Sequence, residues 1–283
     1  MSFQRGKPGQ FTDRGQPKSA SPFTPFEGMD HPLEIVGKAK RGLTGTTVRY
    51  WADEQIFTPD AEFSLPELQK RARQTAFLVP GLRMVVRDLR TNRPDPSLPE
   101  EEVFHYDGGI AEFVEHLSVQ SSVTDVWRIE GSGSFTERVP VLTESGQATM
   151  QDVQRTCEVD IALQWNIGYD TTLRSFVNII ATPKGGTHVA GFEQALLRTF
   201  RKVIEANARR LRPGNDKIEK DDVLAGLTAV LTVRLAEPQF EGQTKEVLGT
   251  SAVRQIVSRI VEKELTKYLS ATRRPEKAQA DAL

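Results

Sequence analysis

The sequence predicts a mixed α+β protein, and three observations support that class. Several segments between residues 123 and 180 are rich in β-branched side chains, which is typical of strands. One of them, 157–165, alternates apolar and polar residues, so we expect a sheet with one buried and one polar face. Two later segments, 187–211 and 250–269, repeat apolar residues at helical spacing. A strand-rich middle followed by two long helices is the expected arrangement.

Composition and charge exclude several classes of protein. The 283 residues, enough for one large domain or two, carry 37 Lys and Arg against 38 Asp and Glu, so the whole chain is not polybasic. A single cysteine, Cys157, excludes a disulfide scaffold, and four scattered histidines show no metal-binding spacing. No apolar run approaches the roughly 18 residues of a membrane span, and no signal peptide begins the chain. We expect a soluble cytoplasmic protein without a metal site.

An irregular segment and two strands are predicted for the beginning of the chain. Residues 1–32 are rich in Gly, Pro and Ser, which predicts a disordered arm or a long loop. Two strands are then expected, over 33–39 and 45–52, with a Lys/Gly turn between them.

A helix with clear start and stop signals follows. Ser64 and Glu67 form a capping box, and Pro80-Gly81 ends the helix. Its expected apolar stripe is Leu65, Leu68, Ala72, Thr75 and Leu78, with Ala76 as an alternative to Leu78. Strands over 82–89 and 102–106 and a helix over 110–117 complete this part.

Longer elements fill the rest of the chain. The first long helix is predicted to be capped by Thr187 and the second to begin at Thr250 or Ser251. The polar tail, 271–283, is expected to fray. Strands are expected over 123–129, 134–142, 157–165, 171–180 and 227–235.

Three segments have residue types suited to binding an anion, each with a plainer interpretation. Glycines before the helix at 184–188 expose backbone N–H groups, although they also make an ordinary turn. Six basic residues against one acid over 198–212 form either a patch for a polyanion or a solvated helix face. Gln243 and Lys245 suit a phosphate oxygen, or lie on an ordinary exposed loop.

Five segments together resemble the B subunits of type IIA DNA topoisomerases, the family of gyrase B and topoisomerase IV B. They occur in the order of the family along most of the chain, so the resemblance is specific. The segments are TGTTVRYW (44–51), FHYDGGIAEF (104–113), GGTHVAGFE (185–193), DDVLAGLTAV (221–230) and AEPQFEGQTKEVLG (236–249).

The resemblance implies an architecture. Residues 1–118 would be the C-terminal part of a GHKL (Bergerat) ATPase domain, in which 1–32 is a loop. Residues 119–270 would be the transducer domain, with a ribosomal S-five-like fold and a left-handed βαβ crossover, followed by a polar tail over 271–283. An insertion around 131–154 would lengthen the first transducer hairpin. The chain would be an internal piece, because the catalytic Glu, Mg-binding Asn, adenine-binding Asp and glycine-rich lid of the family precede the first matched strand.

The resemblance also implies residue roles. Gln243 and Lys245 match the pair that contacts the γ-phosphate of ATP, where Lys245 would have a catalytic role by stabilising charge on the transferring phosphate. Thr46 and Val48 match positions that line the adenine pocket. The basic residues expected to face DNA in the clamp cavity are Lys184, Arg198, Arg201, Lys202, Arg209 and Arg210.

By the same resemblance, the whole protein would be an ATP-hydrolysing DNA topoisomerase that couples hydrolysis to movement of a DNA clamp. ATP and Mg²⁺ would be its cofactors, with the metal ligands outside this chain. Its partners would be DNA, a topoisomerase A subunit in an A2B2 assembly, and a second copy of the B subunit when ATP binds. The chain alone would be inactive. One alternative is a stand-alone, non-enzymatic module of the same fold that binds DNA or a partner. Another is a mismatch-repair ATPase or a ninety-kilodalton heat-shock chaperone, against which the Gln-Thr-Lys loop argues.

Overall fold

The computed structural model forms two compact units, residues 1–61 and 62–283. It describes residues 2–4, 7–11, 22–25, 40–49, 56–58, 61–91, 95–142, 148–212 and 217–283. In the first unit, three short antiparallel strands pair in the order β1-β2-β3, in place of the arm or loop expected for 1–32. At three to five residues each, they are short enough to form despite the prolines. These strands are β1 (Ser2–Gln4), β2 (Lys7–Phe11) and β3 (Phe23–Pro25).

The strand predicted over 45–52 is wrong for the residues that the structure describes. Residues 45–49 form no strand, and all of their side chains are exposed. A strand needs a paired neighbour and a buried face, and no described strand pairs with this segment. The strand predicted over 33–39 lies outside the described residues.

The second unit begins with the capped helix, and the prediction for its ends is confirmed. In α1 (Leu65–Leu78), the Glu67 N–H donates to Ser64 Oγ at 3.4 Å. The buried face differs from the prediction, because Gln69 is buried whereas Leu68 is 44% exposed. The strands β4 (Met84–Arg87) and β5 (Glu101–Phe104) pair antiparallel, and α2 (Ile110–Leu117) spans the predicted residues.

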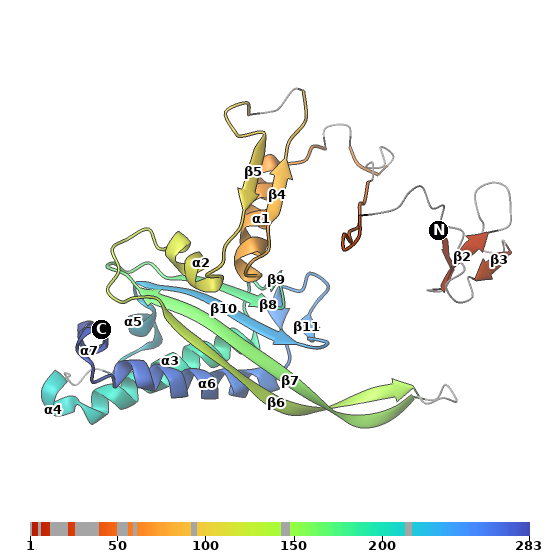
Figure 1. The fold of residues 1–283 in the computed structure, drawn as a ribbon. Helices are drawn as coiled ribbons and strands as arrows, with labels where there is room; N and C mark the ends of the chain where they lie inside the picture. Colours follow the sequence, from red (N-terminus) through yellow and green to blue (C-terminus); the bar gives the residue numbers. More distant parts are fainter. Residues whose placement is uncertain are drawn as a thin grey trace. The chain divides into compact units, whose positions relative to one another are not determined.

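The centre of this unit is a five-stranded sheet in the order β6-β7-β10-β8-β9 (Figure 1). The strand β10 runs antiparallel to β7 and parallel to β8. The chain between the parallel strands β8 and β10 contains β9 and helices, and the left-handed βαβ crossover stays a prediction. The strands are β6 (Trp127–Leu142), β7 (Ala148–Trp165), β8 (Thr172–Val177), β9 (Ile180–Ala181) and β10 (Leu227–Leu235).

The strands β6 and β7 are longer than predicted and extend as a two-stranded ribbon beyond the other strands (Figure 1). The strands predicted over 123–129 and 134–142 are largely one continuous strand, because glycines 131 and 133 do not interrupt it. A Cβ on Gly131 would lie 2.9 Å from the Ile260 side chain, and one on Gly133 would lie 2.7 Å from Ile256. These glycines therefore let a helix approach the strand closely.

Two long helices lie side by side on one face of the sheet, where they bury the main hydrophobic core (Figure 1). The five alternating residues from Cys157 to Trp165 are all at most 4% exposed, so the face predicted to be buried is confirmed. None of the described helices is both long and apolar enough to cross a membrane. The helices of this layer are α3 (Thr187–Ala206), α4 (Ala208–Leu211), α5 (Lys220–Leu224) and α6 (Ala252–Leu269).

The other face of the sheet is not simply polar, which corrects the sequence prediction. Phe176 and Val230 point away from α3 and α6 and pack in a second cluster with Phe77 of α1 and Phe113 of α2. The rings of Phe77 and Phe113 stack with centroids 4.7 Å apart. The alternation of apolar and polar residues in 157–165 predicted only the face that packs against α3 and α6. The opposite face is covered by α1 and α2, which come from a distant part of the sequence.

The polar tail forms a helix, α7 (Arg274–Ala282), so the expectation of fraying is wrong. Gln279 Oε1 accepts hydrogen bonds from the Asp125 N–H at 3.0 Å and from Trp127 Nε1 at 3.1 Å. These bonds attach α7 to the start of β6 and to the segment before it, an arrangement that no local pattern reveals.

Candidate functional site

Gln243 and Lys245 lie at the exposed tip of a short hairpin. Its strands, β11 (Phe240–Glu241) and β12 (Val247–Leu248), pair antiparallel. The tip needs left-handed backbone at two positions, Gly242 with φ 81° and Lys245 with φ 57°. Both candidate side chains are exposed, and no described ion pair includes Lys245. The hairpin thus presents an amide and an ammonium group to solvent.

The base of the hairpin is bonded to the glycine turn that begins α3. The Leu248 N–H donates to the Gly185 carbonyl at 3.1 Å, and the Lys184 N–H donates to the Glu246 carbonyl at 3.3 Å. A Cβ on Gly186 would lie 2.4 Å from the backbone nitrogen of Leu248. The glycines at 184–188 therefore allow two backbones to meet.

The predicted cap of α3 is wrong. Gly186, not Thr187, occupies the N-cap position, and no side chain makes a capping hydrogen bond there. Thr187 Oγ1 instead donates to the Thr250 carbonyl at 2.9 Å. The hydroxyl is used to join α3 to the segment before α6, which explains why it does not cap its own helix.

Glu246 lies in the 236–249 segment, but no role is predicted for it from the sequence. Its carboxylate accepts hydrogen bonds from Lys184 Nζ at 2.7 Å and from Thr244 Oγ1 at 3.1 Å. The bond from Lys184 is the main cause of a lowered pKa for this carboxyl, and the bond from Thr244 adds to it. The Glu246 carboxylate thus forms an ion pair with Lys184, one of the residues predicted to face DNA, and not with the neighbouring Lys245.

The segment that leads into β11, which we call the hairpin stem (237–239), contacts the β6–β7 ribbon. Arg155 of β7 forms ion pairs with Glu237 and with Glu137 of β6, and Gln239 donates to Glu137. The side chains of Arg155 and Glu137 are only 14% and 17% exposed, so this pair is sheltered from solvent, whereas Glu237 is 74% exposed. Residues far apart in sequence form this cluster, and no motif identifies it.

A buried polar chain lies beneath the glycine turn. Thr182 Oγ1 and His188 Nε2 are 3.1 Å apart, and the hydroxyls of Ser175 and Thr182 are 2.8 Å apart. Burial lowers the pKa of His188 to about 4, so the imidazole is neutral at pH 7. His188 is fully buried, which fits a structural role for this side chain.

Several basic side chains of the 198–212 segment, which covers the end of α3 and all of α4, bond to other residues of the protein. Glu262 of α6 pairs with Arg198 at 2.6 Å and with Lys202 at 3.8 Å. Arg201 donates to the Ile218 carbonyl, and Arg210 pairs with Asp281 of α7. Arg209 is exposed. These contacts neutralise part of the basic charge, and both the solvated face and the contact with DNA stay predictions.

Comparison with known proteins identifies the family. The DNA gyrase B family matches residues 109–281, which is more than half of the chain. The chain belongs to the DNA gyrase B family. The gyrase B protein of Campylobacter jejuni is 39% identical over 235 residues, covering 83% of this chain and 26% of the relative. The gyrase B protein of Streptomyces coelicolor is 35% identical over 246 residues, covering 83% of this chain and 33% of the relative. This gyrase B family chain thus spans between a quarter and a third of the length of these relatives.

Solved gyrase B structures have the same mixed α+β fold. The 43K ATPase domain of Thermus thermophilus gyrase B, solved with an aminocoumarin, matches with a TM-score of 0.58 and 26% identity, covering 81% of this chain and 54% of that one. Gyrase B of Myxococcus xanthus matches with a TM-score of 0.55 and 25% identity, covering 82% of this chain and 57% of that one. The α+β class and the resemblance are confirmed, whereas the assignment of 119–270 as a transducer domain stays a prediction.

Two further site residues predicted for this gyrase B family chain lie in the first compact unit. Thr46 and Val48 are both exposed there, and Val48 is 81% exposed. Their role in an adenine pocket, and the role of Gln243 and Lys245 at the phosphate, stay predictions.

Proposed function

We propose that this chain is the part of a type IIA topoisomerase of the gyrase B kind that senses the γ-phosphate of ATP. The observation that carries the proposal is the exposed Gln243–Lys245 tip on a hairpin whose base is bonded to the N-terminus of α3. Family membership supports the gyrase B assignment.

The chemistry of the tip suits a terminal phosphate. The Lys245 ammonium supplies positive charge and the Gln243 amide supplies a hydrogen bond, while the neighbouring carboxylate of Glu246 is held by Lys184. Lys245 would favour the transition state, in which charge develops on the transferring phosphate. Loss of that phosphate would release the tip and, through Leu248 and Gly185, change the restraint on α3.

In this proposal, ATP supplies the phosphate, and Thr46 and Val48 contact its adenine. The Mg²⁺ ligands and the catalytic Glu are assigned to residues outside this chain, so the chain alone does not hydrolyse ATP. The whole gyrase B protein would act on DNA with a topoisomerase A subunit in an A2B2 assembly, and its two copies would associate when ATP binds.

The decisive experiment is the Lys245→Ala substitution in a complete gyrase B protein that carries this segment, with Lys217→Ala at another exposed lysine as the matched control. We expect hydrolysis to slow by about 10²-fold, the usual effect of removing one such stabilising group, while the KM for ATP changes much less. Equal losses in binding and turnover would contradict the role of Lys245.

The isolated chain offers a second test. Because most of the nucleotide pocket is assigned elsewhere, calorimetry should detect negligible binding of ATP. Tight binding would refute the assignment. The alternative, a stand-alone DNA-binding module, has weaker support because Arg198, Lys202 and Arg210 already have acidic partners. Strong, salt-sensitive DNA binding by the isolated chain would favour that alternative.

A further inference from the structure

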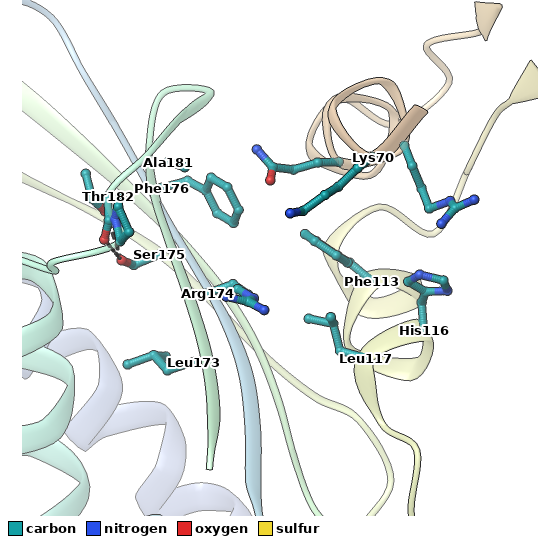
Figure 2. Close-up of a pocket in the computed structure, with 13 residues that line it drawn as sticks. Lys70, Phe113, His116, Leu117, Leu173, Arg174, Ser175, Phe176, Ala181 and Thr182 are labelled. Carbon is teal, nitrogen blue, oxygen red and sulfur yellow. Dashed lines mark hydrogen bonds between the residues drawn. The ribbon is translucent and has the colours of Figure 1, made fainter. Parts of the chain in front are cut away.

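A cavity of about 300 Å³ lies between two layers of the second unit, away from the hairpin residues described above. The helices α1 and α2 form one wall, and β8 with the segment that follows it forms the other (Figure 2). Its size is that of a site for a small molecule.

Basic side chains line this cavity and acidic ones do not. Lys70 and Arg73 come from α1 and Arg174 from β8, and none of the described lining residues is Asp or Glu. Arg73 is held by Glu102 at 3.0 Å, and Lys70 lies 3.7 Å from Glu67, one turn earlier on its own helix. Arg174 is exposed and forms no ion pair with any residue that the structure describes. The cavity therefore has excess positive charge.

The rest of the lining is largely apolar and aromatic. Phe113 and Phe176, from opposite walls, pack against each other at the edge of the cavity, with ring centroids 6.3 Å apart and the rings tilted by 37°. Leu117 and Leu173 extend this surface on the two walls. A flat apolar group would contact these side chains and leave its polar end near the cations.

We propose that this cavity binds a small aromatic anion, with its ring system against Phe113, Leu117 and Leu173 and its carboxylate or phosphate between Lys70 and Arg174. In Figure 2 these two cationic side chains extend toward the gap from opposite walls, which is the arrangement that the proposal requires. The guanidinium of Arg174 can bind two oxygens of such a group at once. The site is independent of the role proposed for Lys245.

The experiment is a titration of the 283-residue chain followed by methyl NMR, with 2-naphthoate as the first probe. Saturable shifts should occur at the methyl groups of Leu117, Leu173 and Ala181. The neutral analogue 2-naphthalenemethanol should bind at least about tenfold more weakly, since one good charged hydrogen bond is worth that much. Comparison with 2-naphthyl phosphate shows which anionic group the site prefers, and inorganic phosphate alone should not shift these methyl groups.

Three substitutions locate the site. Arg174→Glu and Lys70→Glu should each weaken 2-naphthoate by about tenfold or more, and Ala181→Phe should block it by filling the cavity. Arg259→Glu, the same charge change at an exposed position on α6, should have no effect. Equal affinity for the neutral probe, shifts centred elsewhere, unchanged binding in Arg174→Glu, or no saturable shift with either anion would each overturn the proposal.

Discussion

Gly186 joins the hairpin to α3, and adding one methyl group there tests that junction. Its φ of 134° lies in a region that only glycine adopts readily. A Cβ would lie 2.4 Å from the nitrogen and 2.5 Å from the oxygen of Leu248, and both are backbone atoms that cannot rotate away. The Gly186→Ala substitution must therefore displace β12 from the turn.

Gly242→Ala is the matched control, because Gly242 also has a positive φ, 81°, but nothing lies within 4 Å of its added Cβ. The control should cost about 1–2 kcal/mol, the ordinary penalty of left-handed backbone. Gly186→Ala has backbone strain of about 1–3 kcal/mol and also loses the Leu248–Gly185 hydrogen bond, worth about 1 kcal/mol, before the steric clash is included. We expect a total of about 3 kcal/mol or more.

Urea unfolding measures the difference. With a slope of about 3 kcal/mol per molar urea, Gly186→Ala should lower the midpoint by roughly 1 M and the control by clearly less. Amide exchange should also show faster opening at Leu248 in Gly186→Ala alone. Equal midpoints for the two variants, or unchanged protection of the Leu248 amide, would refute the inference that the backbones meet at this glycine.

Other predictions concern buried groups and the C-terminal helix. Folding lowers the pKa of His188 to about 4, so below pH 6.5 the unfolded chain binds a proton that the folded chain does not. The free energy of unfolding should therefore fall by about 2 kcal/mol between pH 7 and pH 5. His188→Gln should make the free energy of unfolding depend less on pH over this range. Burial raises the pKa of the Cys157 thiol to about 11, so iodoacetamide at pH 8 should alkylate it only after unfolding in urea, and rapid labelling of the folded chain would contradict this. Gln279→Ala should speed amide exchange throughout α7, whereas Gln255→Ala should not; unchanged exchange would mean that the bond to Trp127 does not hold the helix.

Local signals predicted much of the fold. The helix over 110–117, the strand over 227–235 and the two long helices all follow from spacing within one element, and Ser64 caps where its motif predicts. Properties that depend on distant neighbours leave no trace in that spacing. Gln69 is buried and Leu68 exposed because the position of β4, β5 and α2 around α1 decides which face is covered.

The candidate site shows the same division. The exposed Gln243 and Lys245 could be placed on a loop from Pro238, Gly242 and Gly249 alone. Their supports could not, because the contact of Arg155 with Glu237 spans 82 residues. Local sequence indicates which side chains a loop displays, whereas the groups that hold the loop in place come from tertiary packing.

The length of the β6–β7 ribbon means that a small movement at Arg155 would displace the far end of the ribbon by a larger distance. From Ser134 to Leu142 the strand advances eight residues beyond the region of α6, a length of about 27 Å at the usual rise of an antiparallel strand. A tilt of about 10° at Arg155 would displace the far end by about 5 Å on that length. Because Arg155 also pairs with Glu237, such a tilt would strain the ion pair that joins the ribbon to the segment before β11. A small change at that ion pair would then accompany a large displacement at the far end of the ribbon.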